Sequence, residues 1–238
     1  MAAVQPQAPP LRRSIVELDP GLAESLDLRD RALARRHAVV DVRDLHEGPV
    51  AVGSLVRETD LGMIVLSGLA ARETPFAGGH VLEIHGPEDL VLSDRERQGV
   101  RWEILAAGRV ALLDARFGQV AARLPSLSAA LLQRAGATAH WLAARVAVLA
   151  LPRVEDRVLA GLGLLADRWG RVGPDGLVVP GPLTHEAIGR LVGARRSTVT
   201  LAISALRREG RIDRRPDGRW VLCERRQASE AMTCLTLV

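Results

Sequence analysis

The stretch that decides the fold is LTHEAIGRLVGARRSTVTLAISALRREGRI, which runs from Leu183 to Ile212. It holds two short patterns of helical periodicity, one on each side of Gly193. We expect Thr184 to cap the first helix, because its hydroxyl can accept from the N–H groups of the first turn. We expect Gly193 to end that helix, because glycine takes up the left-handed backbone conformation without steric cost.

The second pattern predicts a helix from about Arg196 to Glu209. Its inner face consists of Val199, Ala202, Ile203 and Leu206. Its outer face presents Arg196, Ser197, Thr200, Leu201, Ser204 and Arg208. Two helices joined by a tight glycine turn, with polar residues at the start of the second, are typical of a helix-turn-helix that binds DNA. A helical hairpin that only packs against its own domain is the alternative.

The outer face of the second helix has the chemistry that base reading requires. A guanidinium can bind two acceptors of guanine, hydroxyl groups are less selective, and an apolar side chain can contact the methyl group of thymine. The predicted base-reading residues are Arg196, Ser197, Thr200 and Leu201.

The segment RIDRRPDGRWVL predicts two short strands around a turn at Pro216–Gly218, which would form a wing beside the helices. Arginines there would contact phosphates, which position a DNA-binding module without specifying sequence. The residues predicted to contact the DNA backbone are Thr184, His185, Arg195, Arg208, Arg214, Arg215 and Arg219.

The charge distribution favours a nucleic-acid partner for this part of the chain. Residues 183–226 hold eleven Arg against five Asp and Glu, a local charge of +6, whereas the net charge of the whole chain is +4. The remainder therefore carries −2. An asymmetry of this kind suits a nucleic-acid face on one domain, although a solvated arginine-rich surface would give the same count.

The composition argues against a protein with a four-cysteine metal site, a secreted protein and a membrane-spanning protein. The only cysteines, Cys223 and Cys234, are too few for a four-cysteine iron–sulfur or zinc site within one chain. Residues 1–13 lack the apolar core of a signal peptide and predict a disordered lead-in. No uninterrupted apolar run reaches the length that spans a membrane, so we expect a cytoplasmic protein.

Two further regions precede the helix-turn-helix. Residues 14–120 contain short apolar runs separated by glycines, which predicts an antiparallel barrel or sandwich. Residues 125–151 have almost no turn signal and predict one long helix. The predicted DNA-binding domain covers residues 152–228, and residues 229–238 form a tail without a clear pattern.

The long helix is expected to join two copies of the chain. An apolar row on a helix about 40 Å long usually needs a partner helix, most simply the same helix of a second subunit. The alternative is that the row packs only on its own domain. The predicted interface residues are Leu127, Leu131, Ala135, Leu142, Val146 and Leu149.

This order of parts resembles the Crp–Fnr family of bacterial transcription regulators, most clearly in residues 183–212. The resemblance implies an α+β fold: an N-terminal antiparallel β-roll or jelly-roll sensor domain of the cyclic-nucleotide-binding type, a long dimerisation helix and a C-terminal winged helix-turn-helix. It also implies a homodimer that binds a near-palindromic operator and contacts RNA polymerase. Arg196 matches the arginine of the family that contacts guanine, whereas Ser197 and Leu201 differ from the cyclic-AMP receptor protein.

The sensor region departs from the family pattern. Residues Gly86–Asp89 resemble the turn that leads into the cyclic-AMP cassette, but the Gly-Glu and Arg-Ser pairs that hold the cyclic phosphate do not follow. The cysteines of an oxygen-sensing cluster are absent, and the six histidines are scattered, without a haem signature. The sequence therefore predicts no cofactor and does not identify an effector.

Three other functions remain as alternatives. The chain could bind DNA constitutively with a purely structural β domain, or it could be a small-molecule-binding or protein-interaction module that does not touch DNA. An enzyme is the third, but the sequence has no paired carboxylate motif, phosphate-binding glycine loop or nucleophile triad.

Overall fold

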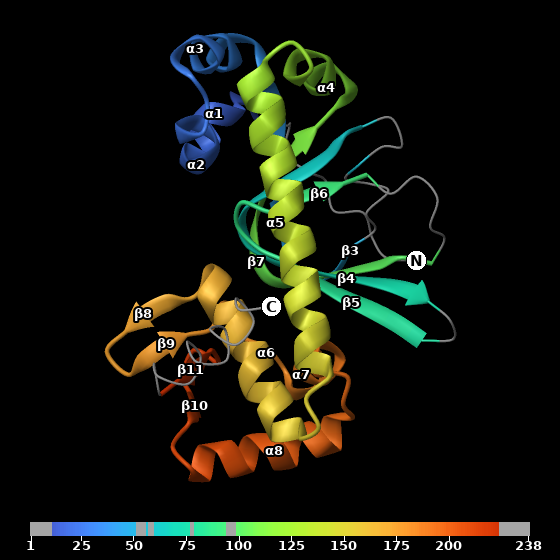
Figure 1. The fold of residues 1–238 in the computed structure, drawn as a ribbon, viewed down its shortest axis with the longest axis vertical. Helices are drawn as coiled ribbons and strands as arrows, with labels where there is room; N and C mark the ends of the chain where they lie inside the picture. Colours follow the sequence, from blue (N-terminus) through green and yellow to red (C-terminus); the bar gives the residue numbers. More distant parts are fainter. Residues whose placement is uncertain (1–10, 51–55, 57–59, 77–78, 94–98, 224–238) are drawn as a thin grey trace. The chain divides into compact units, whose positions relative to one another are not determined.

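The computed structural model describes residues 11–50, 56, 60–76, 79–93 and 99–223. It divides into two compact units: unit 1 comprises residues 1–74 and 85–136, and unit 2 comprises residues 75–84 and 137–238. The division between them passes through α5 (Pro125–Leu149, Figure 1) and, earlier in the chain, through the strand residues on either side of 75–84. Among the described residues, none of the helices is long and apolar enough to cross a membrane.

An antiparallel sheet and a group of helices build unit 1. The sheet has the order β1 (Leu11–Ser14), β2 (Val39–Leu45), β7 (Arg101–Leu113), β4 (Gly62–Phe76) and β5 (Gly79–His85), of which residues 79–84 of β5 fall in unit 2. Two short strands complete it: β3 (Gly48–Val50) pairs with β7, and β6 (Leu90–Leu92) pairs with β4. The helices are α1 (Ile15–Leu18), α2 (Pro20–Glu24), α3 (Leu28–His37) and α4 (Ala115–Ala121), followed by the first half of α5.

Strand β1 corrects the predicted lead-in. The sequence predicts disorder for residues 11–13, but they pair antiparallel with β2, with Leu11 opposite Val42. The ladder is supported by an ion pair between the Arg12 Nε and the Asp41 Oδ1, 3.1 Å apart. A neighbouring strand therefore orders this segment, although its own composition shows no strand pattern.

The core of unit 1 lies between the helices and the sheet. One apolar cluster includes Ile15, Leu22, Ile64 and Phe117, all at most 1% exposed, together with Leu127 of α5. Four of these side chains come from helices and Ile64 comes from β4, as expected for a sheet with one face covered by helices.

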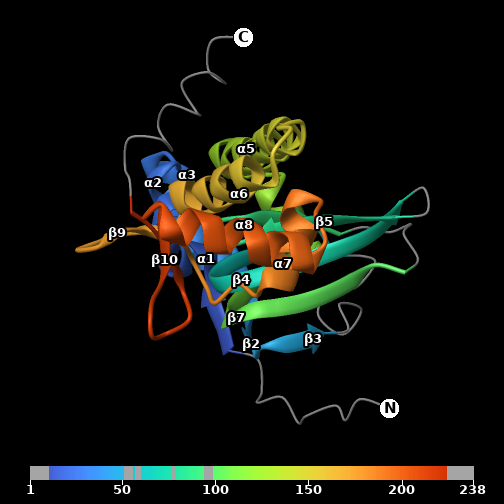
Figure 2. The ribbon, with the colours of Figure 1, turned by 90° about the horizontal axis from the view of Figure 1, so that it is seen from below.

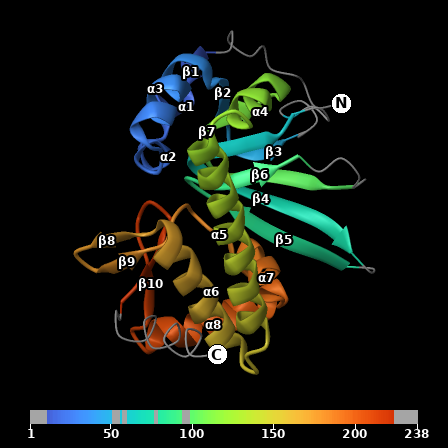
Figure 3. The ribbon, with the colours of Figure 1, turned by 45° about the horizontal axis from the view of Figure 1, so that its top comes forward.

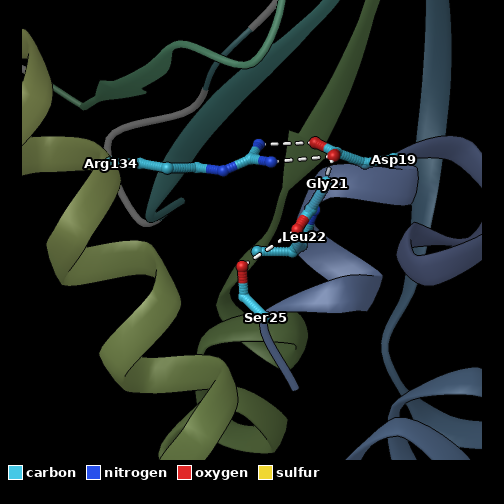
Figure 4. A network of polar contacts seen from close by, with 5 residues as sticks. All are labelled: Asp19, Gly21, Leu22, Ser25 and Arg134. Atoms are coloured by element: carbon cyan, nitrogen blue, oxygen red, sulfur yellow. Dashed lines mark hydrogen bonds and ion pairs between the residues drawn. The ribbon is translucent and has the colours of Figure 1, made fainter.

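Buried polar contacts fasten α5 to the N-terminal helices of unit 1. Asp19 caps α2 by accepting from the Leu22 N–H at 2.9 Å, and its carboxylate also accepts from both terminal nitrogens of Arg134, with Nη2 2.7 Å from Oδ1 (Figure 4). Asp30 accepts from the backbone N–H and the hydroxyl of Ser126, both at 2.9 Å. These pairs fix the start of α5 against α2 and α3.

The helix-turn-helix and its wing form most of unit 2. After the second half of α5, the chain continues as α6 (Val154–Trp169), β8 (Arg171–Gly173) and β9 (Gly176–Val178). Next come α7 (His185–Val192), α8 (Arg196–Arg208), β10 (Ile212–Arg214) and β11 (Trp220–Leu222). The four strands make a small antiparallel sheet in the order β10-β11-β9-β8. Figure 2 shows α7 and α8 following one another, with β10 beyond the end of α8.

Candidate DNA interface

The first helix of the motif begins and ends where its local chemistry predicts. The Thr184 hydroxyl accepts from the Ala187 N–H at 3.1 Å, and Leu183 and Ile188 are buried on either side of this cap. The helix ends at Gly193, whose φ of 63° and ψ of 43° lie in the left-handed region. A side chain at that position would be strained, so glycine sets the sharp turn into α8.

The turn itself leaves little free space. The Ala194 N–H donates to the Gly189 carbonyl at 2.9 Å, and a Cβ on Gly189 would lie 2.6 Å from the Ala194 carbonyl oxygen. Glycine at 189 therefore allows the backbone of the turn to close onto α7.

Two arginines from other helices hold the end of α7, and sequence reasoning missed both roles. The Arg157 Nη1 donates to the carbonyls of Val192 and Gly193 at 3.1 and 3.3 Å, and the Arg145 Nε donates to the Leu191 carbonyl at 3.3 Å. Arg145 also donates to the Leu82 carbonyl. Burial lowers the pKa of Arg145 from its ordinary value, and the charge of Glu83 opposes this change. These donors satisfy carbonyls that a helix end leaves without intrahelical partners.

The second helix presents its two faces as predicted. Val199, Ala202, Ile203 and Leu206 are at most 3% exposed and pack inward. The residues predicted to read bases are all exposed, and Leu201, at 72%, is a large apolar side chain left in solvent. They are Arg196, Ser197, Thr200 and Leu201.

Hydrogen bonds distinguish these four residues from one another. The Thr200 hydroxyl donates to the Arg196 carbonyl at 2.9 Å and lies 2.9 Å from the Nδ1 of His185. The side chains of Arg196 and Ser197 have no hydrogen bond or ion pair with other described residues. These two side chains are therefore open to an external partner, whereas Thr200 is oriented by its own domain.

His185 links α7, α8 and the wing. Its ring lies 5.8 Å from the Trp220 ring, and its Nδ1 contacts Thr200. Desolvation lowers the pKa of His185, and the positive charges of Arg214 and Arg196 lower it further. The neutral imidazole is therefore favoured at this position.

The wing is anchored by a tryptophan. Trp220 is 1% exposed, and its Nε1 donates to the Leu183 carbonyl at 2.8 Å, which joins β11 to the start of α7. The Arg214 guanidinium lies over this ring, 5.2 Å from its centroid. Within the turn, the Arg219 Nη2 lies 2.6 Å from the Asp217 carboxylate, and this hydrogen bond lowers the pKa of Asp217.

The arginines predicted to contact the DNA backbone differ in whether they already have partners within the chain. Arg195 has no hydrogen bond or ion pair from its side chain within the described residues, and neither does Arg215. Arg219 is already paired with Asp217, and the Arg208 Nε donates weakly to the Ser204 carbonyl at 3.4 Å.

Comparisons with known proteins agree with this geometry. The family model described as a Crp-like helix-turn-helix domain matches residues 156–228. No curated protein matches the sequence. A solved CRP/FNR-family transcriptional regulator from Thermus thermophilus is 22% identical, covers 81% of this chain and 98% of its own, and has a TM-score of 0.59.

The chain is a DNA-binding transcription regulator. The predicted winged helix-turn-helix, the α+β fold and the resemblance to Crp–Fnr regulators are confirmed.

Two other solved regulators share the fold. A mutant of CooA from Carboxydothermus hydrogenoformans is 17% identical, covers 80% of this chain and 87% of its own, and has a TM-score of 0.62. The c-di-GMP-responsive global regulator CLP of Xanthomonas campestris is also 17% identical, with a match that covers 87% of this chain and 100% of CLP and a TM-score of 0.57.

The predicted dimer residues of the regulator separate into two groups. Val146 and Leu149 are 67% and 38% exposed, and Ala135 and Leu142 are half-buried. Leu127 and Leu131, however, are 0% and 7% exposed within the core of unit 1. The prediction for these two residues is therefore corrected: their side chains fill the core of their own chain and are not available to a second copy.

Residues 94–98, which follow the turn that resembles the start of the cyclic-AMP cassette, lie outside the described residues, as do the tail 229–238 and Cys234. In the described part, the turn at 86–89 is closed by the Gly86 N–H, which donates to the Asp89 carboxylate at 3.1 Å. Glu88 takes a φ of 72° in this turn.

Proposed function

We propose that the regulator binds a near-palindromic operator as a homodimer, under the control of a signal received by its N-terminal β domain. The observation that carries the proposal is the open outer face of α8, held in place by an almost fully buried inner face. A recognition helix of this kind lies in the major groove, where residues of its first turns meet base edges.

Arg196 is the strongest base reader in this arrangement. It is exposed at the first position of α8, with no ion pair among the described residues to compete for its guanidinium. Ser197 follows it, and Leu201 lies one turn further along, where its side chain could contact a thymine methyl group. Thr200 is expected to assist through the orientation that His185 imposes on it.

The proposed backbone contacts lie at the edges of this helix. Arg195 precedes α8, Thr184 and His185 begin α7, and Arg208 ends α8. Arg214, Arg215 and Arg219 come from the wing. Phosphate contacts from several elements would fix the register of α8 without specifying sequence.

The exposed face of α5 supports the proposed dimer. Among its exposed residues, a row of small and apolar side chains recurs at alternating steps of three and four: Ala129, Leu132, Gly136, Ala139, Ala143, Val146 and Ala150 immediately after the helix. This is the heptad spacing of a two-helix seam, and the small residues would allow two helices to approach closely. An apolar seam that faces solvent in one chain favours burial against an identical chain.

Arg196→Ala tests the base-reading role. We expect specific binding to weaken by about 1–3 kcal/mol and one base position of the operator to lose its preference. Arg195→Ala is the matched control, because loss of a phosphate contact should weaken all duplexes about equally and reduce the salt dependence. Binding is measured by fluorescence anisotropy against a panel of single-base operator variants. An unchanged base preference in Arg196→Ala would refute the assignment.

We propose RNA polymerase as a further partner of the bound dimer. A regulator that occupies an operator beside a promoter changes transcription either by contacting the polymerase or by blocking it. Transcription in vitro from a template that carries the operator distinguishes these outcomes.

A further inference from the structure

We propose that unit 1 contains a ligand site, a pocket for a small organic anion between β1, α3 and α4. The pocket has a volume of about 450 Å³, which is within the range of sites for small molecules. It is lined by Arg12, Arg36, Arg116 and Arg123, and we call it the arginine pocket. Figure 3 shows α3, which bears Arg36, and α4, which bears Arg116 and is followed by Arg123.

The arginine pocket has one sign of charge. Four guanidiniums and His37 line it, and no carboxylate is among its lining residues. Arg12 is paired with Asp41 at 3.1 Å. Within the described residues, Arg36, Arg116 and Arg123 have no ion pair or side-chain hydrogen bond. A pocket lined by one sign of charge concentrates counter-ions, and guanidiniums bind phosphate and carboxylate groups through paired hydrogen bonds.

Helix electrostatics account for only part of this clustering. Arg36 and His37 lie in the last turn of α3, where positive charge suits the helix dipole. Arg116, by contrast, lies in the first turn of α4, where a positive charge is unfavourable. Arg35, also in the last turn of α3, is paired with Glu17 at 3.3 Å outside the pocket. Arg35 of this turn therefore has an ion-pair partner, whereas Arg36, Arg116 and Arg123, which line the pocket, have none among the described residues.

The rest of the lining indicates what the anion carries. Leu33, Val39 and Val120 are half-buried and Leu124 is buried, and all four line the same pocket as the arginines. Apolar walls beside convergent charges are typical of sites for amphiphilic small molecules. We infer a ligand with two or more phosphate or carboxylate charges next to an apolar or ring-shaped part.

This inference names a chemical class for the signal in the proposed function, and it rests on that function only for the effect on DNA. The site is tested first without DNA, by isothermal titration calorimetry of the full chain at constant ionic strength. The probes are ATP, citrate and inorganic pyrophosphate, which separate an organic phosphate, a polycarboxylate and a bare phosphate. The test variant is Arg36→Gln/Arg116→Gln/Arg123→Gln.

The control variant removes the same charge elsewhere in unit 1. Arg29, Arg43 and Arg109 do not line the pocket, and no ion pair holds them among the described residues. Their triple change to Gln should leave anion binding as in the unmodified chain. The pocket variant should lose at least about tenfold in affinity for ATP or citrate. Because anions can also bind the basic helix-turn-helix, only this difference between the two variants counts.

These measurements test the binding site and its effect on DNA binding separately. Loss of binding in the pocket variant alone, with circular dichroism unchanged, supports the site. The site is refuted if the pocket variant and the control variant bind the three probes with the same affinity. It is also refuted if binding is weak and falls by the same factor in both variants. The effect of the bound probe on operator affinity is then measured separately. A probe that binds the pocket but leaves DNA affinity unchanged keeps the site and rejects its role in signalling.

Discussion

The Thr200 hydroxyl is engaged twice within the protein, which sets it apart from its neighbours on α8. It donates to the Arg196 carbonyl and contacts His185, so its remaining capacity for a base edge is small. Arg196 and Ser197 lack such partners among the described residues. Base discrimination should therefore depend mainly on these two residues and on the apolar contact of Leu201.

His185 gives the regulator a pH-dependent stability. Burial and two nearby arginines lower its pKa in the folded chain, whereas the unfolded chain has the ordinary value of about 6.5. As pH falls below about 6.5, the unfolded chain takes up this proton first, so the free energy of unfolding decreases; above that pH the contribution is constant. Urea unfolding at pH 8 and pH 5.5 should show a smaller decrease for His185→Gln than for the unmodified chain. Equal decreases would contradict this account of His185.

At the scale of elements, the turn between α7 and α8 depends on its backbone conformation. Gly193→Ala places a Cβ on a left-handed residue and 3.3 Å from the Leu149 Cδ2. We expect the free energy of unfolding to fall by about 1–2 kcal/mol. Gly118→Ala is the control, because its Cβ would meet nothing within 4 Å inside α4. That change should stabilise by about 0.5–1 kcal/mol. Urea unfolding curves check both, and a loss of equal size in both variants would contradict the role of the turn.

The helix-turn-helix could be predicted because its signals are local. The contacts that hold it in place could not, because they join residues that are far apart in the sequence. The cap at Thr184 and the turn at Gly193 depend on neighbouring residues, so both follow from the sequence. The contacts of Arg145 and Arg157 with the end of α7 join residues 35 to 46 positions apart, and no local pattern reports them. Leu127 was misassigned because an apolar row shows that a helix face is buried but does not show what covers it.

For the molecule as a whole, we propose that the exposed face of α5 joins two chains. Leu132→Glu/Val146→Glu places charges at two positions that are 73% and 67% exposed in one chain, two heptads apart. We expect sedimentation equilibrium to show a monomer, because a charge buried without a partner in an apolar seam is costly. Leu28→Glu is the control, since Leu28 is 84% exposed on α3 and lies outside the seam. A dimer in the double variant would contradict the proposed interface.

We propose that two copies of α8 read one operator. The most direct test selects duplexes from a random pool with the full-length chain and sequences the bound fraction. We expect a near-palindromic consensus whose half-sites are centred about 10 base pairs apart, or a multiple of that spacing, with binding that weakens steeply as salt increases. Selection of no consensus, or of a single asymmetric site bound by one chain, would contradict it.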